Sequence, residues 1–201
     1  MADKILLNNE NYFAGEEDLP CLITYAPKTG GSHFSVTLVT NLFLNGSKIL
    51  FFTAYPMAKD NFFEQINGME DRVVYIESVD QLEANKNAQV VILKSGDEKL
   101  FLEIAPKLAD INERVVLVKN IEVFSDAVFD YCSKLQKVIF SGDIDKCGAK
   151  DKIIAKGYKT IVAFSKPEFS LPFKLPALEK YDGYLWSEKK SGLVKVEKNT
   201  L

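Results

Sequence analysis

The sequence has few of the residues that build metal sites, disulfide frameworks or imidazole-based catalysis. It contains three cysteines and one histidine among 201 residues. The odd number of cysteines and their spacings match no zinc or disulfide framework, and a reducing cytoplasm is the expected location. Because His33 is the only imidazole, no Ser/His/Asp or Cys/His catalytic set is expected. Cys21 and Cys132 are expected in the core, whereas Cys147, next to Lys146, is the candidate for a reactive thiol.

The sequence also lacks a strong net charge and a long apolar run. A formal net charge of -3 gives no general attraction to nucleic acid or to an anionic membrane, so neither is indicated as a partner. No apolar stretch reaches the roughly 18 residues of a membrane span, and residues 1–15 show no signal-peptide pattern. The hydrophobic content of 47% is that of an ordinary globular protein.

What the sequence does have is a regular alternation of two kinds of segment. Short runs rich in Val, Ile, Leu and Phe are typical of buried parallel strands, and the longer amphipathic runs between them are typical of helices. The predicted fold class is therefore α/β, with a mostly parallel sheet and helices on both faces. Strands are expected at residues 21–25, 48–53, 72–76, 89–93, 114–118, 137–140 and 160–164, and helices at residues 32–44, 58–67, 78–86, 97–111 and 125–135.

The end of the chain follows a different pattern. Two β-prone runs, at residues 181–186 and 192–197, predict a C-terminal antiparallel hairpin that closes one edge of the sheet. Residues 166–176 hold three of the seven prolines and are expected to form an extended connection. The whole chain, residues 1–201, is interpreted as a single domain, with an N-terminal extension at residues 1–18 and the hairpin at residues 181–198.

The turn after the first strand has features of a phosphate-binding loop, G-x-x-x-x-G-K-[ST]. Gly30 takes the place of the second glycine, and Ser32 takes that of the hydroxyl residue. Tyr25, however, stands at the first glycine and Gly31 at the lysine. The helix that begins here would offer its free amides and its dipole to an anion. The predicted anion-binding residues are Lys28, Thr29, Gly30, Gly31, Ser32 and His33.

The order of these segments resembles the core of RecA/KaiC-like P-loop ATPases. The stretch TGGSHFSVTLVTNLFLNGSKILFFTAY is similar to their loop, first helix and second strand, and YDGYLWSEKKSGLVKVEK is similar to their terminal hairpin. The resemblance covers roughly residues 19 to 198. It implies a RecA-like three-layer sandwich, with the nucleotide loop at the carboxyl edge of the sheet.

Three departures from the family pattern concern hydrolysis. The lysine of the loop is missing, and the second strand runs into Thr53-Ala54 where the family has its glutamate. The family's magnesium-side aspartate ends an apolar strand, but the two candidate strands here end in Lys94 and Lys119. Asp97 is interpreted as a first-turn residue of the next helix. Asp143 is either a site residue or the aspartate of a turn.

Several roles remain open at these positions. Lys28, Lys94 and Lys119 either bind an anion without magnesium or open solvated loops. Tyr25, Phe34 and Tyr55 either stack on a base or belong to the core. His33 is either an anion contact or a partly exposed residue of the first helical turn.

We expect a non-hydrolysing RecA-like protein, in effect a pseudo-ATPase, that acts as an assembly or accessory subunit by protein–protein association. A homo-oligomer or a heteromeric protein partner is expected. No cofactor is expected beyond a weakly held nucleotide or phosphate. The alternative is an atypical nucleotide-binding protein or slow NTPase that uses Lys28 and Ser32.

Overall fold

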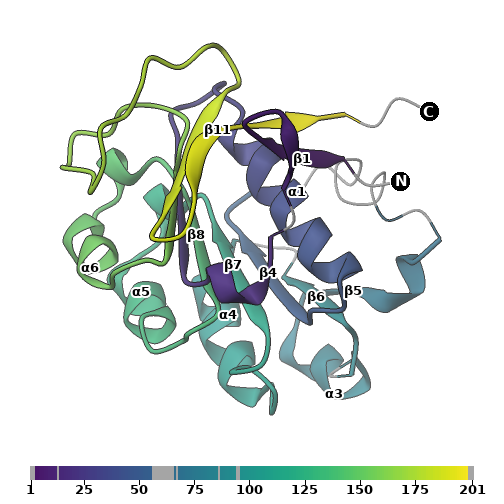
Figure 1. Ribbon diagram of the computed structural model, residues 1–201. Helices are drawn as coiled ribbons and strands as arrows, with labels where there is room; N and C mark the ends of the chain where they lie inside the picture. Colours follow the sequence, from purple (N-terminus) through teal and green to yellow (C-terminus); the bar gives the residue numbers. More distant parts are fainter. Residues whose placement is uncertain are drawn as a thin grey trace.

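The computed structural model describes residues 3–12, 14–55, 66, 68–85, 87–93 and 96–198. These residues form one 11-stranded sheet in the order β2-β1-β11-β10-β9-β3-β8-β7-β4-β6-β5 (Figure 1). The strands from β9 to β5 are parallel, and the four at the other end of the sheet are antiparallel. The predicted fold class is thereby confirmed.

The parallel strands coincide with the apolar runs of the sequence. Their residues are buried on both faces, as expected of strands covered by helices on each side. In β4, for example, Leu50 and Phe52 point into one core, whereas Ile49 and Phe51 point into the other. The parallel strands are β3 (Cys21–Thr24), β4 (Ile49–Thr53), β5 (Val73–Ile76), β6 (Val90–Leu93), β7 (Val115–Lys119), β8 (Val138–Gly142) and β9 (Thr160–Ala163).

Helices cover both faces of the sheet (Figure 1). Among the described residues, α1 (Gly31–Leu44) packs on one face and four shorter helices pack on the other. These are α3 (Leu82–Asn85), α4 (Glu98–Ile104), α5 (Asp126–Cys132) and α6 (Lys150–Ala155). Single 3₁₀ turns also occur: η1 (Glu16–Asp18), η2 (Glu70–Arg72), η3 (Val79–Gln81), η4 (Ala105–Lys107), η5 (Ile121–Val123) and η6 (Ile144–Lys146).

Some helices are shorter than the periodicity predicts. The helix expected at residues 97–111 ends as α4 at Ile104 and continues for one 3₁₀ turn that contains Pro106. Asp97 caps this helix by accepting hydrogen bonds from the amides of Lys99 and Leu100. Almost all of the helix expected at residues 58–67, and Lys86 of the helix expected at 78–86, lie outside the described residues.

The antiparallel end of the sheet differs from the prediction. The C-terminal hairpin forms as β10 (Gly183–Ser187) and β11 (Ser191–Glu197), but it does not close the edge. The N-terminal segment supplies β1 (Lys4–Leu7), which pairs with β11, and β2 (Glu10–Tyr12), which is the outermost strand. Residues 4–12, expected to form an extension, are therefore part of the sheet.

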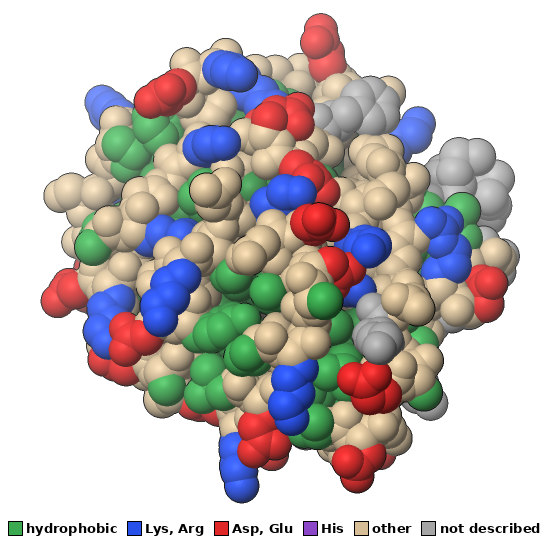
Figure 2. Space-filling model, turned by 90° about the horizontal axis from the view of Figure 1, so that it is seen from below, with side chains coloured by type: hydrophobic (Ala, Val, Ile, Leu, Met, Phe, Trp, Pro, Cys, Tyr) green, Lys and Arg blue, Asp and Glu red, His purple; other side chains and the backbone are tan. Residues whose placement is uncertain are grey.

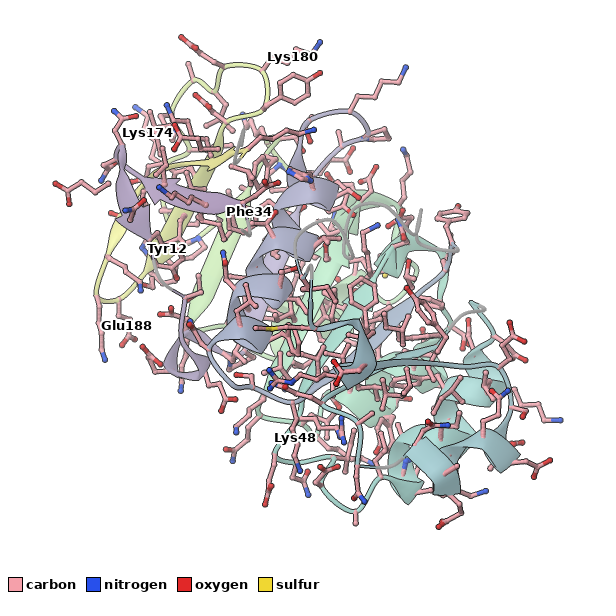
Figure 3. The ribbon with its side chains drawn as sticks, turned by 90° about the vertical axis from the view of Figure 1, so that its right-hand side faces the viewer. Tyr12, Phe34, Lys48, Lys174, Lys180 and Glu188 are labelled. Carbon is pink, nitrogen blue, oxygen red and sulfur yellow. The ribbon has the colours of Figure 1, made fainter. Side chains whose placement is uncertain are left out.

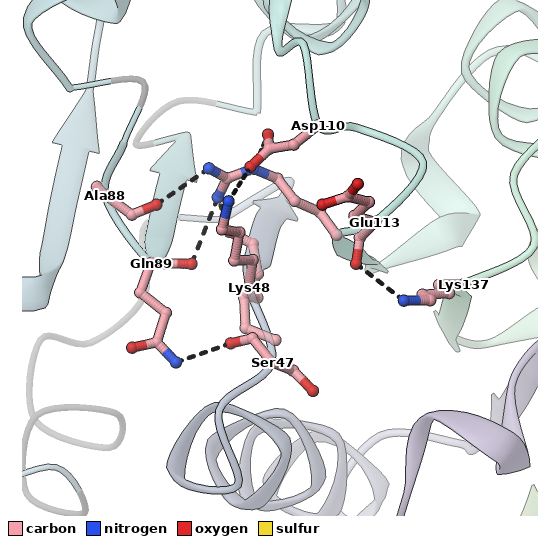
Figure 4. Close-up of polar contacts among 9 residues, drawn as sticks. Ser47, Lys48, Ala88, Gln89, Asp110, Glu113 and Lys137 are labelled. Carbon is pink, nitrogen blue, oxygen red and sulfur yellow. Dashed lines mark hydrogen bonds and ion pairs between the residues drawn. The ribbon is translucent and has the colours of Figure 1, made fainter.

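A buried arginine holds the amino edge of the sheet together (Figure 4). Arg114 has no exposed surface, and its Nε donates to Asp110 at 2.7 Å. Its terminal nitrogens donate to the carbonyl oxygens of Ile49, Ala88 and Gln89.

The surface seen from below carries charged side chains of both signs around apolar ones (Figure 2).

Candidate functional site

The predicted loop lies between the end of β3 and the start of α1, at the carboxyl edge of the parallel strands. Two of its residues have left-handed backbones, Lys28 with φ 65° and Gly30 with φ 100°. Gly30 also lies close to another segment, because a Cβ added there would be 3.3 Å from Tyr181 Cα. The neighbouring Lys180 stands at the same end of the molecule as the start of α1, opposite Lys48 (Figure 3).

Short hydrogen bonds tie the loop to itself and to the adjacent strands. The hydroxyl of Thr29 donates to the carbonyl oxygen of Ala26 at 2.7 Å. The amide of Ala26 donates to Ser165 Oγ, just beyond β9, at 2.9 Å. The amide of Tyr25 donates to the carbonyl oxygen of Gly142, at the end of β8. The loop is thus anchored on both sides of β3.

Of the six consecutive residues predicted to bind an anion, three lie in the loop before α1 and three in the first turn of α1, and their side chains differ in access. Lys28 and Ser32 are exposed, and Gly31 is buried. His33 is partly exposed, and its Nε2 lies 3.1 Å from a carboxylate oxygen of Asp3, in the N-terminal segment. His33 therefore faces an acidic side chain of the same chain.

The side chain of Tyr25 fills the space beside Gly31. It is 7% exposed, and a Cβ added to Gly31 would lie under 3.0 Å from Cβ, Cγ and Cδ1 of this tyrosine. Burial is the largest influence on the Tyr25 hydroxyl and raises its pKa, and the carboxylates of Glu122 and Asp143 act in the same direction. The nearby hydroxyls of Ser141 and Ser32 oppose this rise in pKa, although the Tyr25 hydroxyl makes no hydrogen bond of ordinary geometry with any residue that the structure describes.

The end of β7 carries a lysine and an asparagine. Burial lowers the pKa of the Lys119 amine, and the nearby carboxylate of Glu122 partly opposes this. Asn120 has a left-handed backbone with φ 66°, and its Oδ1 accepts a hydrogen bond from the Thr53 hydroxyl at 3.0 Å. The ends of β4 and β7 are thus joined by two neutral polar side chains.

The end of β8 contributes Asp143, whose carboxylate forms an ion pair with Lys146 at 2.9 Å. The amide of Asp143 donates to Glu122 Oε2 at 3.0 Å. Asp143 therefore lies in a turn of its own, directly before η6. Sequence reasoning did not single out Glu122, Asn120 or Ser141, although Ser141 ends an apolar strand at the same edge as Lys119.

The remaining candidates have simpler positions. Phe34 is completely buried and packs against Phe164 with 5.3 Å between ring centroids, so it is a core residue. Tyr55 is 58% exposed. Lys94 lies outside the described residues.

The three cysteines are buried free thiols. Cys147 is shielded, because its Sγ donates to the carbonyl oxygen of Ile121 at 3.3 Å and burial raises its pKa.

No protein-family model matches the chain, and no curated protein matches it in sequence. Solved structures do match. The EssC ATPases 2 and 3 from Geobacillus thermodenitrificans superpose with a TM-score of 0.57 at 13% identity, over 98% of this chain and 40% of that one. The cytoplasmic domain of EssC gives 0.59 at 14% identity, over 98% of this chain and 43% of that one. The genome packaging NTPase B204 of Sulfolobus turreted icosahedral virus 2, in complex with AMPPCP, gives a TM-score of 0.55 at 10% identity. The match covers 94% of this chain and 100% of that one.

These identities are low enough that the likeness concerns the fold alone. The chain spans less than half the length of the two EssC structures. Within the described residues, no helix combines the length and the hydropathy that crossing a bilayer requires. The likeness to these structures gives the chain a P-loop NTPase-like α/β fold.

Proposed function

We propose that this protein is a non-hydrolysing, RecA-like P-loop domain that works as an assembly or accessory subunit in the cytoplasm, through association with protein. The observation that carries the proposal is the end of β7, where the apolar strand leads into a partly buried Lys119. Hydrolysis of a nucleotide needs a carboxylate for magnesium and an oriented water at such a strand end. A lysine ammonium in that place binds no magnesium and would repel it.

The neighbouring strand end supports the same conclusion. Thr53 stands where the resemblance leads one to expect a hydrolytic glutamate, and its hydroxyl is engaged with Asn120. A threonine hydroxyl and an amide oxygen cannot take a proton from water near neutral pH. The two strand ends therefore stabilise each other and offer no general base.

Apolar side chains along the carboxyl edge support the association. Tyr55, Val123 and Tyr181 are 58%, 46% and 55% exposed, and each follows or precedes a strand at this edge. Exposed apolar side chains at one edge of a sheet are available for contact with another protein. A second copy of the chain is the first partner to test.

The catalytic half of the proposal is tested by phosphate release from ATP and GTP with magnesium. The wild-type protein is expected to release phosphate no faster than the buffer alone. The alternative, a slow NTPase, draws on the exposed positions of Lys28 and Ser32. Release above the blank that Lys28→Ala abolishes would establish the alternative and reject the proposal.

The association half is tested by light scattering of the purified protein across a concentration series up to tens of micromolar. The mean mass is expected to rise with concentration as copies associate. A constant monomer mass, together with the absence of any partner in a pull-down, would contradict this half.

A further inference from the structure

Two positions of the loop differ from the phosphate-loop pattern in opposite ways. One carries a large residue where the pattern has a small one, and the other carries a small residue where the pattern has a large one. In the pattern G-x-x-x-x-G-K-[ST], the small first residue leaves space, and the lysine at the seventh position reaches the phosphates. Here the first position is Tyr25 and the seventh is Gly31. The tyrosine ring lies directly over the Cα of that glycine, because a Cβ on Gly31 would overlap atoms of the ring.

The ring therefore runs through the space where a side chain from position 31 would begin. Its hydroxyl ends beside Ser32, which stands at the hydroxyl position of the pattern, and beside Ser141 at the end of β8. Tyr25 is 7% exposed and Ser141 is completely buried. The aromatic side chain is thus held from three sides by α1, β8 and the loop.

The chemistry of this occupant differs from that of a lysine. A phenol brings no positive charge, and its hydroxyl lies on the side of Ser32, the residue whose hydroxyl the pattern offers to a metal ion.

We infer that Tyr25 is an internal occupant of the place of the missing lysine side chain, and that its ring excludes a nucleoside triphosphate from the loop. This inference deepens the proposed function and rests on it, because it gives a physical reason for the loop not to bind a nucleotide. The group that fills this place is thus a side chain of the protein itself.

The inference is tested by reversing the exchange in the full chain. The double variant Tyr25→Gly/Gly31→Lys makes residues 25–32 read GAPKTGKS, which satisfies the pattern at every position. Calorimetric titration with ATP and magnesium is expected to give no binding for the wild type up to about 1 mM. The double variant is expected to bind at least roughly tenfold more tightly than that limit.

The single variants are the matched controls. Gly31→Lys alone is expected to gain no binding, because its Cβ would collide with the retained ring. Tyr25→Gly alone removes the ring but supplies no cation, so its gain should be smaller than that of the pair. A folded double variant that binds ATP no better than the wild type would overturn the inference.

A second measurement does not depend on nucleotide. Gly31→Ala is expected to lower the thermal midpoint of the wild type by about 4 °C, because overpacking a buried site costs stability. In the Tyr25→Gly background the same change should be neutral or stabilising, since the ring is gone. Equal effects of Gly31→Ala in both backgrounds would also overturn the inference.

The outcomes separate this inference from the proposed function. Phosphate release by the wild type would reject the function. If the wild type releases no phosphate and the folded double variant binds ATP no better than the wild type, only the role of Tyr25 is rejected. The proposed function is then unaffected.

Discussion

Arg114 carries a full positive charge into a part of the sheet that water does not reach. Replacing it by methionine is expected to lower the free energy of unfolding by about 3–5 kcal/mol, because Asp110 and three carbonyl oxygens would lose their partner. Arg114→Lys should recover only part of this loss, since one ammonium cannot reproduce the guanidinium fork. Urea unfolding at pH 7 measures both changes.

The matched control is a lysine in a partly exposed ion pair at the same edge. Lys137 forms an ion pair with Glu16. Its ammonium also donates to the carbonyl oxygen of Glu113 (Figure 4). Lys137→Ala is expected to change stability by no more than about 1 kcal/mol. Similar losses for the arginine and lysine variants would contradict the structural role given to Arg114.

Asp110 should make the stability of the protein depend on pH in the acidic range. Burial, the largest influence on this carboxyl, raises its pKa, but hydrogen bonds from Arg114 and Lys48 together hold the pKa below its ordinary value. Because the unfolded state then takes up the proton first, the stabilisation is present above about pH 4 and is lost as pH falls through the folded-state pKa.

Asp110→Asn removes this titration. Urea midpoints at neutral pH should be lower for the variant than for the wild type, and the difference should shrink as the pH is lowered from 5 to 2.5. A difference that stays constant over this range would show that Asp110 is not the titrating group.

Part of the candidate site could be predicted residue by residue. The spacing of the loop identifies Gly31, and the end of an apolar run identifies Lys119, because both depend only on local sequence. Glu122 and Ser141 could not be identified in this way. Their relevance depends on the direction of the Tyr25 ring, which is set by packing between strands that are distant in sequence.

At the scale of elements, the parallel strands could be predicted because both of their faces are buried, so their apolar runs are continuous. The positions of the helices could be predicted, but their lengths could not. Pro106, for example, interrupts an apolar periodicity that continues to Leu108 and Ile111. The strands β1 and β2 are too short to show an alternation of apolar and polar residues. The strand that pairs with β1 is also distant from it in sequence.

The strand β1 is expected to be essential to the sheet. Ile5 is 1% exposed and lies in the same core as Phe34 of α1. Ile5→Ala should cost about 2–4 kcal/mol, as truncation of a buried aliphatic side chain does. The exposed neighbour Lys4 provides the control, since Lys4→Ala removes no buried atoms. If both variants unfold at the wild-type urea concentration, residues 4–7 do not contribute to the core.

At the scale of the whole molecule, the carboxyl edge should carry the association. The triple variant Tyr55→Ser/Val123→Ser/Tyr181→Asn removes the exposed apolar side chains there, and asparagine tolerates the left-handed backbone of Tyr181, φ 73°. We expect its self-association constant, from light scattering or sedimentation, to weaken by roughly tenfold or more.

An exposed leucine away from this edge serves as the control. Leu44 ends α1 and is 37% exposed. Leu44→Ser should leave the association unchanged. An equal weakening in both variants would locate the contact elsewhere or show that it is unspecific.

The pairing of β1 with β11 also bears on how the molecule is made. Lys4 lies opposite Glu197, so β1 leaves the ribosome well before its partner strand, and this ladder forms only after β11 has been made. At ordinary rates of translation that interval is about 10–40 s. During this time Ile5 and Leu6 have no strand beside them on the β11 side. The growing chain therefore carries an unfinished sheet until β11 has been synthesised, and a chaperone that shields residues 4–7 would act within that interval.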